Sequence, residues 1–347
     1  MMRGIAVGVL LLTAAARTPP PTLVGYPNSM ASLGDSITRA FNTGALPFTD
    51  GERNSWATGT NESVGSHYLR ILGQEQSVLG RNDNEARSGA RVDDLLAQVR
   101  AANEDAVSYV TILIGANDVC TSGVDSMTSV DAFRDAFGKA MRALSAGSPR
   151  ARIFVASIPD VYRLWAILHD SVWARLAWRV LHVCPSLLDD PGSTDADDMR
   201  RRRVVRRRTR DLNEQLEEVC ARYLHCRFDD GAVFADPFTR ADVSSRDFFH
   251  PSLEGQERLS RVTWGATFDF SDRTPPTSTA TITRSQTRTL VALEASDDVG
   301  VAGIEYRLDA GPFRRYASTL SVAVGSELRY RAVDVNGNIE STHVLLG

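Results

Sequence analysis

The sequence predicts an α/β domain built on a parallel sheet, followed by a small all-β domain. Short apolar runs alternate with amphipathic stretches of helical spacing, and polar residues suited to catalysis follow three of those runs. From Arg273 onward the texture changes, because threonine and serine rise and residues alternate with period two. A chain of 347 residues with 43% apolar content can fill both cores.

The first residues have the three-part pattern of a secretory signal. Arg3 is followed by an apolar run over 5–12 and by small residues through Ala16. The run is too short to span a bilayer, and the prolines at 19–21 would stop a helix. We expect cleavage near Ala16, export from the cell, a proline-rich linker over 17–25 and a folded domain over 26–271.

Strands and helices are expected in alternation through that domain. The predicted strands are residues 29–33, 76–79, 109–114, 152–158 and 226–229, and the predicted helices include 66–72, 92–101 and 130–144. The run 109–114 is continuously apolar, which is typical of a central parallel strand. Such a sheet is covered by helices on both faces and places ligands at the carboxyl ends of its strands.

Four groups of residues with catalytic potential lie at such positions. Ser36 stands in a turn after the first strand, Gly89 in a polar loop and Asn117 directly after the central strand, while Asp247 and His250 precede the last helix. A serine becomes a useful nucleophile when a base takes its proton and hydrogen-bond donors stabilise the oxyanion. The chain supplies residue types for each of these parts.

In this order, the four blocks resemble those of the SGNH (GDSL-type) hydrolase family, over roughly residues 26–268. The resemblance implies a three-layer αβα domain with a five-stranded, flavodoxin-like sheet. It also implies Ser36 as nucleophile and His250 as base, with Asp247 orienting the imidazole. The implied oxyanion donors are the backbone amides of Ser36 and Gly89 and the side chain of Asn117. Asp35 and Asp118 belong to the same blocks, and we expect them to support loop geometry.

The implied activity is that of a secreted serine esterase or lipase that forms an acyl-enzyme and uses no metal or cofactor. Alternatives are a phospholipase of A or B type, a polysaccharide or peptidoglycan O-deacetylase, and an inactive cell-surface binding protein. Ser55-Trp56 resembles the phospholipase B type and related secreted actinobacterial members. Trp56 and Trp165 are candidate substrate contacts, although Trp56 can equally anchor its loop in the core. Residues 161–184 are expected as a helix pair that covers the sheet or a cap over the site.

Four cysteines are expected to form disulfides, since an exported chain folds under oxidising conditions. They allow three pairings; we favour Cys220 with Cys226 as a local clip and Cys120 with Cys184 as a link between two loops. A zinc site is less favoured, because no Cys-x-x-Cys pair occurs.

Charge argues against nucleic acid as a partner. The net charge is −4, and the seven arginines within 200–208 are followed directly by acidic residues. Val204, Val205, Leu212 and Leu216 would form the inward stripe of this helix, so the arginines are interpreted as a solvated face. The expected partner is an ester or lipid substrate, and we expect a monomer.

The tail, residues 272–347, is expected to form a small Ig-like β-sandwich. Strands are predicted over 290–295, 303–308 and 328–333, with turns at 309–311 and 336–337. The tail resembles bacterial Ig-like or OmpL47-type repeats, which implies a spacer or an attachment to cell wall or polysaccharide. Asp334, Asn336 and Asn338 suggest calcium, but their spacing fits turn chemistry better than a calcium loop.

Overall fold

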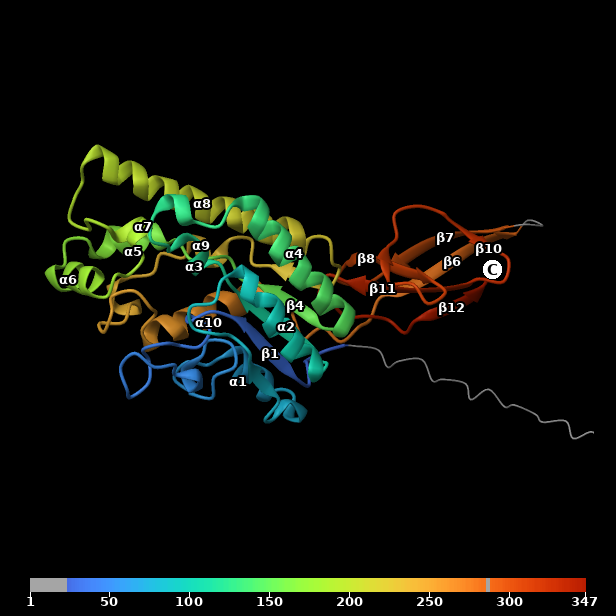
Figure 1. Cartoon of the computed structure of the whole chain (residues 1–347). Coiled ribbons are helices and arrows are strands. Elements are labelled where there is room, and N and C mark those ends of the chain that lie inside the picture. Colours follow the sequence, from blue (N-terminus) through green and yellow to red (C-terminus); the bar gives the residue numbers. More distant parts are fainter. Residues whose placement is uncertain (1–23, 285–287) are drawn as a thin grey trace, which may run out of the picture.

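A parallel five-stranded sheet forms the centre of the protein (Figure 1). The computed structural model describes residues 24–284 and 288–347, so the expected signal and most of the proline-rich linker lie outside the described residues. The strands are β1 (Met30–Gly34), β2 (Asn82–Asn84), β3 (Tyr109–Leu113), β4 (Arg152–Val155) and β5 (Cys226–Phe228). Their order is β2-β1-β3-β4-β5 and every pairing is parallel, which is the predicted flavodoxin-like arrangement.

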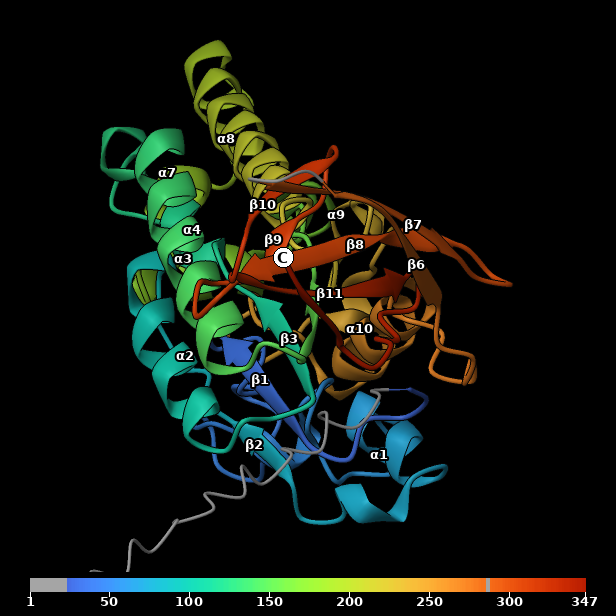
Figure 2. The same cartoon turned by 90° about the vertical axis from the view of Figure 1, so that its right-hand side faces the viewer.

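Helices cover both faces of this sheet. Helices α2 (Leu95–Glu104), α4 (Val130–Gly147) and α8 (Ala196–Cys220) pack side by side on one face, whereas α1 (His67–Leu72) and α10 (Leu253–Ala266) lie on the other (Figure 2). Shorter helices surround the carboxyl ends of the strands: α3 (Ala116–Val119), α5 (Val161–Leu168), α6 (Val172–Val180), α7 (Pro185–Leu188) and α9 (Ala232–Ala235). Fully buried β3 lies at the centre of the sheet, as predicted.

The second strand was predicted in the wrong place. Residues 76–79 carry a 3₁₀ turn over Gln76–Val78, and the strand is the polar segment Asn82–Asn84 at the sheet edge. An edge strand pairs on one side only and can remain half exposed, so it needs no apolar run. The helix expected over 92–101 instead begins with a 3₁₀ turn at Val92–Asp94 and continues as α2.

The arginine-rich helix α8 only partly matches the expected solvated face. Arg202 is fully buried, with its guanidinium 4.4 Å from the ring centre of Trp165 and hydrogen bonds to the carbonyls of Ser193 and Asp190. Arg206 pairs with Asp160, whereas Val204, predicted to face inward, is exposed. These arginines therefore hold the segments around α5 and α7 to the domain.

The C-terminal β domain consists of two antiparallel sheets. One contains β6 (Thr277–Arg284), β7 (Arg288–Ser296) and β10 (Leu320–Ala323); the other contains β8 (Val301–Leu308), β9 (Arg314–Arg315), β11 (Glu327–Asp334) and β12 (His343–Leu346). Alternate residues, including Val291, Leu293 and Leu328, fill its own core. This domain covers the amino ends of the parallel strands, at the opposite end of the molecule from α6 (Figure 1).

A buried arginine joins the two domains. Arg152, the first residue of β4, donates to the carbonyl of Gly25 at 2.5 Å, the carbonyl of Gly337 at 3.2 Å and Oδ1 of Asn338 at 2.7 Å. Asp334 accepts hydrogen bonds from Asn336 and Asn338. The three residues considered for calcium are therefore joined to one another in the turn over residues 334–338.

Candidate active site

The turn after β1 places Ser36 at the carboxyl edge of the sheet. Gly34 ends this strand with φ +151°, and a Cβ added there would lie 2.2 Å from the carbonyl oxygen of Leu113, so the position requires glycine. The buried amide of Gln98 donates to the Gly34 carbonyl and accepts from its N–H, at 2.9 and 2.8 Å. Sequence reasoning did not identify Gln98, which lies on the inward face of α2.

Ser36, His250 and Asp247 form a continuous hydrogen-bonded chain. Oγ of Ser36 lies 2.8 Å from Nε2 of His250, and Nδ1 of the same imidazole lies 2.7 Å from Oδ2 of Asp247. The other oxygen of Asp247 accepts from the backbone amides of Phe249 and His250. One short loop thus delivers both the imidazole and the carboxylate, and this is the arrangement that general-base activation of a serine requires.

The carboxylate of Asp247 is held in its ionised form. Burial alone would raise the pKa of Asp247, but the hydrogen bond to His250 and the backbone amides outweigh it, so the pKa is lowered. Asn42, buried with φ +67°, adds a further hydrogen bond from Nδ2 to Oδ2 of Asp247. No signal in the sequence connected Asn42 with a residue 205 positions away.

Three donors surround the space next to Ser36. Gly89, with φ +83°, and Asn117 line an open cleft together with Ser36 and His250. Among the hydrogen bonds of the described residues, neither the Ser36 N–H nor the Gly89 N–H has an acceptor. Nδ2 of Asn117 uses one hydrogen on the carbonyl of Ala90 at 2.9 Å, which fixes the amide and leaves its second hydrogen free. Donors without partners beside a nucleophile are suited to stabilising an oxyanion.

Two buried carboxyl groups lie beneath these loops. Asp35 accepts from the amide of Ile37 through Oδ1, but its buried Oδ2 has no partner, and burial raises its pKa to about 7. Asp118 accepts from Thr128 and from the amide of Val92, and burial raises its pKa to about 6. Both hold loops that carry site residues, and neither touches the Ser36 hydroxyl through a hydrogen bond.

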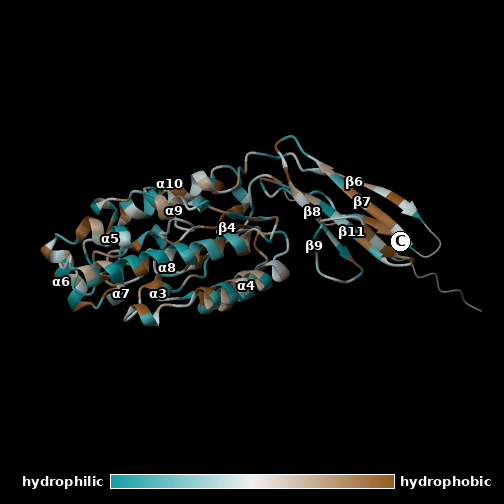
Figure 3. Ribbon diagram, turned by 90° about the horizontal axis from the view of Figure 1, so that it is seen from above, coloured by the Kyte–Doolittle hydropathy of each residue, from teal (hydrophilic) through white to brown (hydrophobic). Residues whose placement is uncertain are grey.

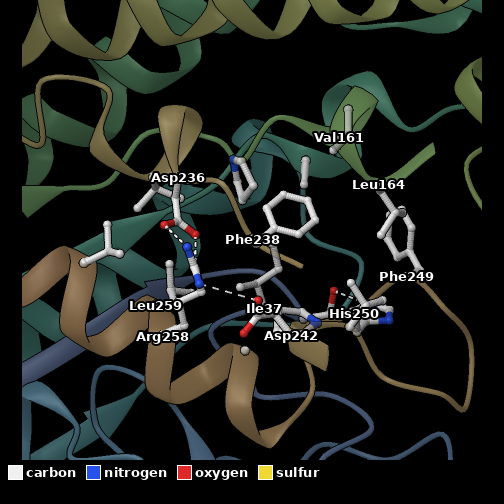
Figure 4. A pocket seen from close by; sticks show the side chains of 18 of the residues that line it. Ile37, Val161, Leu164, Asp236, Phe238, Asp242, Phe249, His250, Arg258 and Leu259 are labelled. Atoms are coloured by element: carbon white, nitrogen blue, oxygen red, sulfur yellow. Dashed lines mark hydrogen bonds and ion pairs between the residues drawn. The ribbon is translucent and has the colours of Figure 1, made fainter. Parts of the chain in front are cut away.

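An apolar pocket of about 100 Å³ opens beside Ser36 and His250 (Figure 4). Its walls come from the turn after β1, from α3, α5, α9 and α10, and from the loops next to these helices. The aliphatic and aromatic lining residues are Ile37, Ala116, Pro159, Val161, Leu164, Val233, Phe238, Val243, Phe249, Leu259 and Val262. A hydrocarbon chain bound there would be removed from water within reach of the nucleophile.

Neither tryptophan proposed as a substrate contact lines this pocket or the open cleft. Trp56 is fully buried in the core, edge-on to His67, with Nε1 3.4 Å from Oγ1 of Thr38. Trp165 lies beneath Arg202 and donates to the carbonyl of Pro191. Both expectations are wrong for the same reason: each indole N–H already has an acceptor inside the fold.

Both favoured disulfides are present, and one of them lies at the site. Cys220 and Cys226 join the end of α8 to β5, while Cys120 and Cys184 join the end of α3 to the start of α7. The second bridge lines the open cleft beside Asn117. Among the described residues there is no group of His, Cys, Asp or Glu arranged to hold a metal ion, and no helix long and apolar enough to cross a membrane.

The chain is similar to several known proteins. The sequence profile of the GDSL-like Lipase/Acylhydrolase family matches residues 32–258. An extracellular lipase from Streptomyces rimosus is 17% identical, with a TM-score of 0.42 over 69% of this chain and 99% of its own. A phospholipase A1 from Streptomyces albidoflavus is 15% identical, with a TM-score of 0.42 over 71% of this chain and 100% of its own. An acetyl xylan esterase from Geobacillus stearothermophilus is 17% identical, with a TM-score of 0.39 over 70% of this chain and 95% of its own. No curated protein sequence matches the chain.

Proposed function

The chain belongs to the GDSL-like lipase/acylhydrolase family, and on this premise we propose that it hydrolyses carboxylic esters of aliphatic acids outside the cell. The observation that carries the proposal is the 2.8 Å contact between Ser36 and His250 at the mouth of an apolar pocket. Acetyl groups alone would leave most of that pocket empty, so an O-deacetylase role is the less favoured one. The intact Ser36–His250–Asp247 chain also argues against an inactive binding protein.

In the proposed reaction, Oγ of Ser36 attacks the ester carbonyl carbon while Nε2 of His250 takes its proton. The carbonyl oxygen becomes an oxyanion held by the amides of Ser36 and Gly89 and the side chain of Asn117. As the C–O bond to the alcohol breaks, His250 returns the proton to the leaving oxygen. Water then attacks the acyl-enzyme and gives a proton to His250. As the bond between Oγ and the acyl carbon breaks, His250 passes this proton to Oγ of Ser36 and the acid is released.

A chromogenic short-chain ester tests the proposal. Purified protein should hydrolyse it, and Ser36→Ala should lower kcat by at least about ten-thousandfold, because loss of the nucleophile disables the whole unit. Ser122→Ala is the control, since its hydroxyl contacts only Ser126 on an exposed loop. Absence of hydrolysis by the unsubstituted protein, or full activity of Ser36→Ala, would refute the proposal.

A second candidate function is hydrolysis of lipids at a surface, favoured by exposed apolar side chains on α6. Trp173 is 71% exposed, Val180 67% and Val172 64%, and Leu176 and Leu181 extend the same face.

The exposed face of α6 lies beside the loop that carries Asp247. It borders Arg246 and Phe248, which flank the catalytic Asp247. Arg246 in turn donates to the carbonyl of Leu46, and the side chains of Leu46 and Phe48 are both exposed. Figure 3 shows α6 at the end of the molecule far from the β domain. Large exposed apolar patches mark interaction sites.

Activity on lipid vesicles separates this candidate from simple esterase activity. Trp173→Ser combined with Leu176→Ser should lower hydrolysis of vesicle phospholipid by about tenfold or more, while hydrolysis of a soluble short-chain ester stays within twofold. A concentration-dependent dimer lost in the same variant, or equal effects on both substrates, would show that the patch serves another purpose.

We also propose that the exported protein uses its C-terminal domain for attachment to a cell-surface polymer. The two antiparallel sheets and the resemblance to Ig-like repeats support this role. Cosedimentation of the intact protein with insoluble cell-wall polysaccharide tests it, and a protein that stays in the supernatant at all polymer concentrations would oppose it.

A further inference from the structure

The apolar pocket beside Ser36 ends at a charged cluster. Arg258, on α10, donates through Nε and Nη2 to both oxygens of Asp236, at 2.6 and 2.9 Å. Its Nη1 lies 3.7 Å from Oδ2 of Asp242. Figure 4 shows Arg258 and Asp236 facing each other on one side of the pocket and His250 on the other, with Phe238 between them.

From this arrangement we infer that the Arg258–Asp236 ion pair closes the acyl pocket and sets the longest acyl chain that the enzyme accepts. The inference rests on the proposed ester hydrolysis and names its substrate class: esters of unbranched aliphatic acids up to a fixed length. The carbonyl carbon would lie at Ser36 and the methyl end of the chain would point toward Arg258.

The cluster is better suited to end a hydrocarbon site than to bind a charged group. One guanidinium faces two carboxylates, and Asp242 is itself held by the N–H and hydroxyl of Thr239. An anionic chain end would therefore meet an excess of negative charge and a guanidinium whose fork is already occupied. A methyl group requires no polar partner and can rest against the aliphatic part of Arg258 and the neighbouring Leu259 and Val262.

Removing the pair would open the pocket, because its far side meets solvent. The side chains of Arg258 and Asp236 are 23% and 15% exposed, whereas other lining residues, such as Leu164 and Val243, are buried. A longer acyl chain would have to separate a two-point ion pair without replacing its hydrogen bonds. Alanine at position 258 has no atoms beyond Cβ, so the longer chain could pass outward.

The test is the dependence of kcat/KM on acyl length, measured with p-nitrophenyl esters from butyrate to palmitate. The full-length protein should reach an optimum and then lose rate with each added pair of carbons. Arg258→Ala should move the optimum to longer esters and raise the ratio of long-chain to optimum-chain kcat/KM by about tenfold or more, since each methylene accommodated is worth about that much. Asp236→Ala removes the other member of the ion pair and should also move the optimum to longer esters. It replaces Arg258→Ala in the test if that variant does not fold.

Arg261→Ala is the matched control. Arg261 lies three residues further along α10, pairs with Glu257 at 3.3 Å and is 58% exposed, away from the pocket. Its acyl-length profile should equal that of the unsubstituted protein. A profile that rises without limit to palmitate, or one that Arg258→Ala and Asp236→Ala leave unchanged, would overturn the inference while leaving ester hydrolysis intact. No hydrolysis of any ester would instead reject the proposed function.

Discussion

The two ends of the parallel sheet use buried polar groups in opposite ways. At the carboxyl end, Oδ2 of Asp35 is buried without a partner, and burial raises the pKa of both Asp35 and Asp118. At the amino end, Arg152 has three acceptors, and Arg331 reaches Glu305 at 2.8 Å and the carbonyl of Pro149. The first end carries unfavourable electrostatics beside the candidate site, while Arg152 and Arg331 at the second end have acceptors and join two domains.

Positive backbone φ angles also occur beside the candidate site. At the catalytic end, Asn42 and Phe248 are non-glycine residues with positive φ, and they flank Asp247 by hydrogen bonding and by sequence. Such conformations cost about 1 kcal/mol or more each and persist when their surroundings hold them. At the amino end, the buried His225 is an exception to the pairing of polar groups. Its Nδ1 lies 3.8 Å from Oε1 of Glu305, and neither ring nitrogen has a hydrogen-bond partner.

The largest expected effect comes from the catalytic end. Asp247→Asn should lower kcat for a short-chain ester by about ten-thousandfold, because an amide cannot stabilise the imidazolium of His250 or hold its tautomer. The matched change at the amino end is Asp272→Asn, which alters a carboxylate that accepts from Asn336 at 2.9 Å and from the backbone amide of Thr274 at 3.0 Å. Its kcat should stay within twofold; a comparable loss in both variants would erase the distinction between the two ends.

A smaller effect is expected in the pH dependence of stability. The pKa of Asp35 is about 7 in the folded protein, against about 4 when unfolded, so its contribution to stability is complete below pH 4 and is lost as the pH rises through 7. Asp35→Asn does not titrate. From pH 4 to pH 8, the free energy of unfolding of this variant should therefore rise relative to the unsubstituted protein by as much as about 4 kcal/mol.

Urea unfolding at both pH values measures this change. The difference in free energy of unfolding between Asp35→Asn and the unsubstituted protein would be the same at pH 4 and pH 8 if ionised Asp35 did not destabilise the fold. The carboxyl end of the sheet would then resemble the amino end.

The smallest effect is expected where the polar groups are paired. Arg152→Ala should lower the free energy of unfolding by about 2 to 3 kcal/mol, since three buried acceptors lose their donor, while kcat below the unfolding temperature stays within twofold. Arg329→Ala, which breaks an exposed pair with Glu327, should cost less than about 1 kcal/mol. If kcat falls together with stability in Arg152→Ala, the amino end also shapes the active site.

The candidate site residues that were predicted from the sequence lie in compact blocks. Ser36 follows an apolar strand, and Asp247 and His250 are three residues apart, so each is visible within a short window. Asn42 and Gln98 were missed because their partners, Asp247 and Gly34, are distant in sequence and only the fold brings them together. The fold class was predicted correctly because buried parallel strands show continuous apolar runs, whereas the strand order was implied by the family resemblance and not by those runs.

Other features depend on tertiary contacts and could not be predicted from composition. The polar edge strand β2 has no apolar run to reveal it. Arg202 was expected in solvent among its neighbouring arginines, but carbonyl groups of the 189–193 segment and the ring of Trp165 surround it. An arginine can be buried when its donors find acceptors and its charge lies over an aromatic face, and neither partner is adjacent in sequence.

The Cys120–Cys184 bridge has a consequence for how substrate reaches Ser36. It fixes the chain just after α6, where Ser186 also bonds to the backbone of Val119 and Thr121, while Trp178 on α6 donates to the carbonyl of Phe248. The α5–α6 hairpin is therefore tethered just beyond the end of α6 and also, through Trp178, to the loop that holds Asp247. A reductant, rather than a substrate, is therefore the agent expected to loosen this hairpin beside the open cleft.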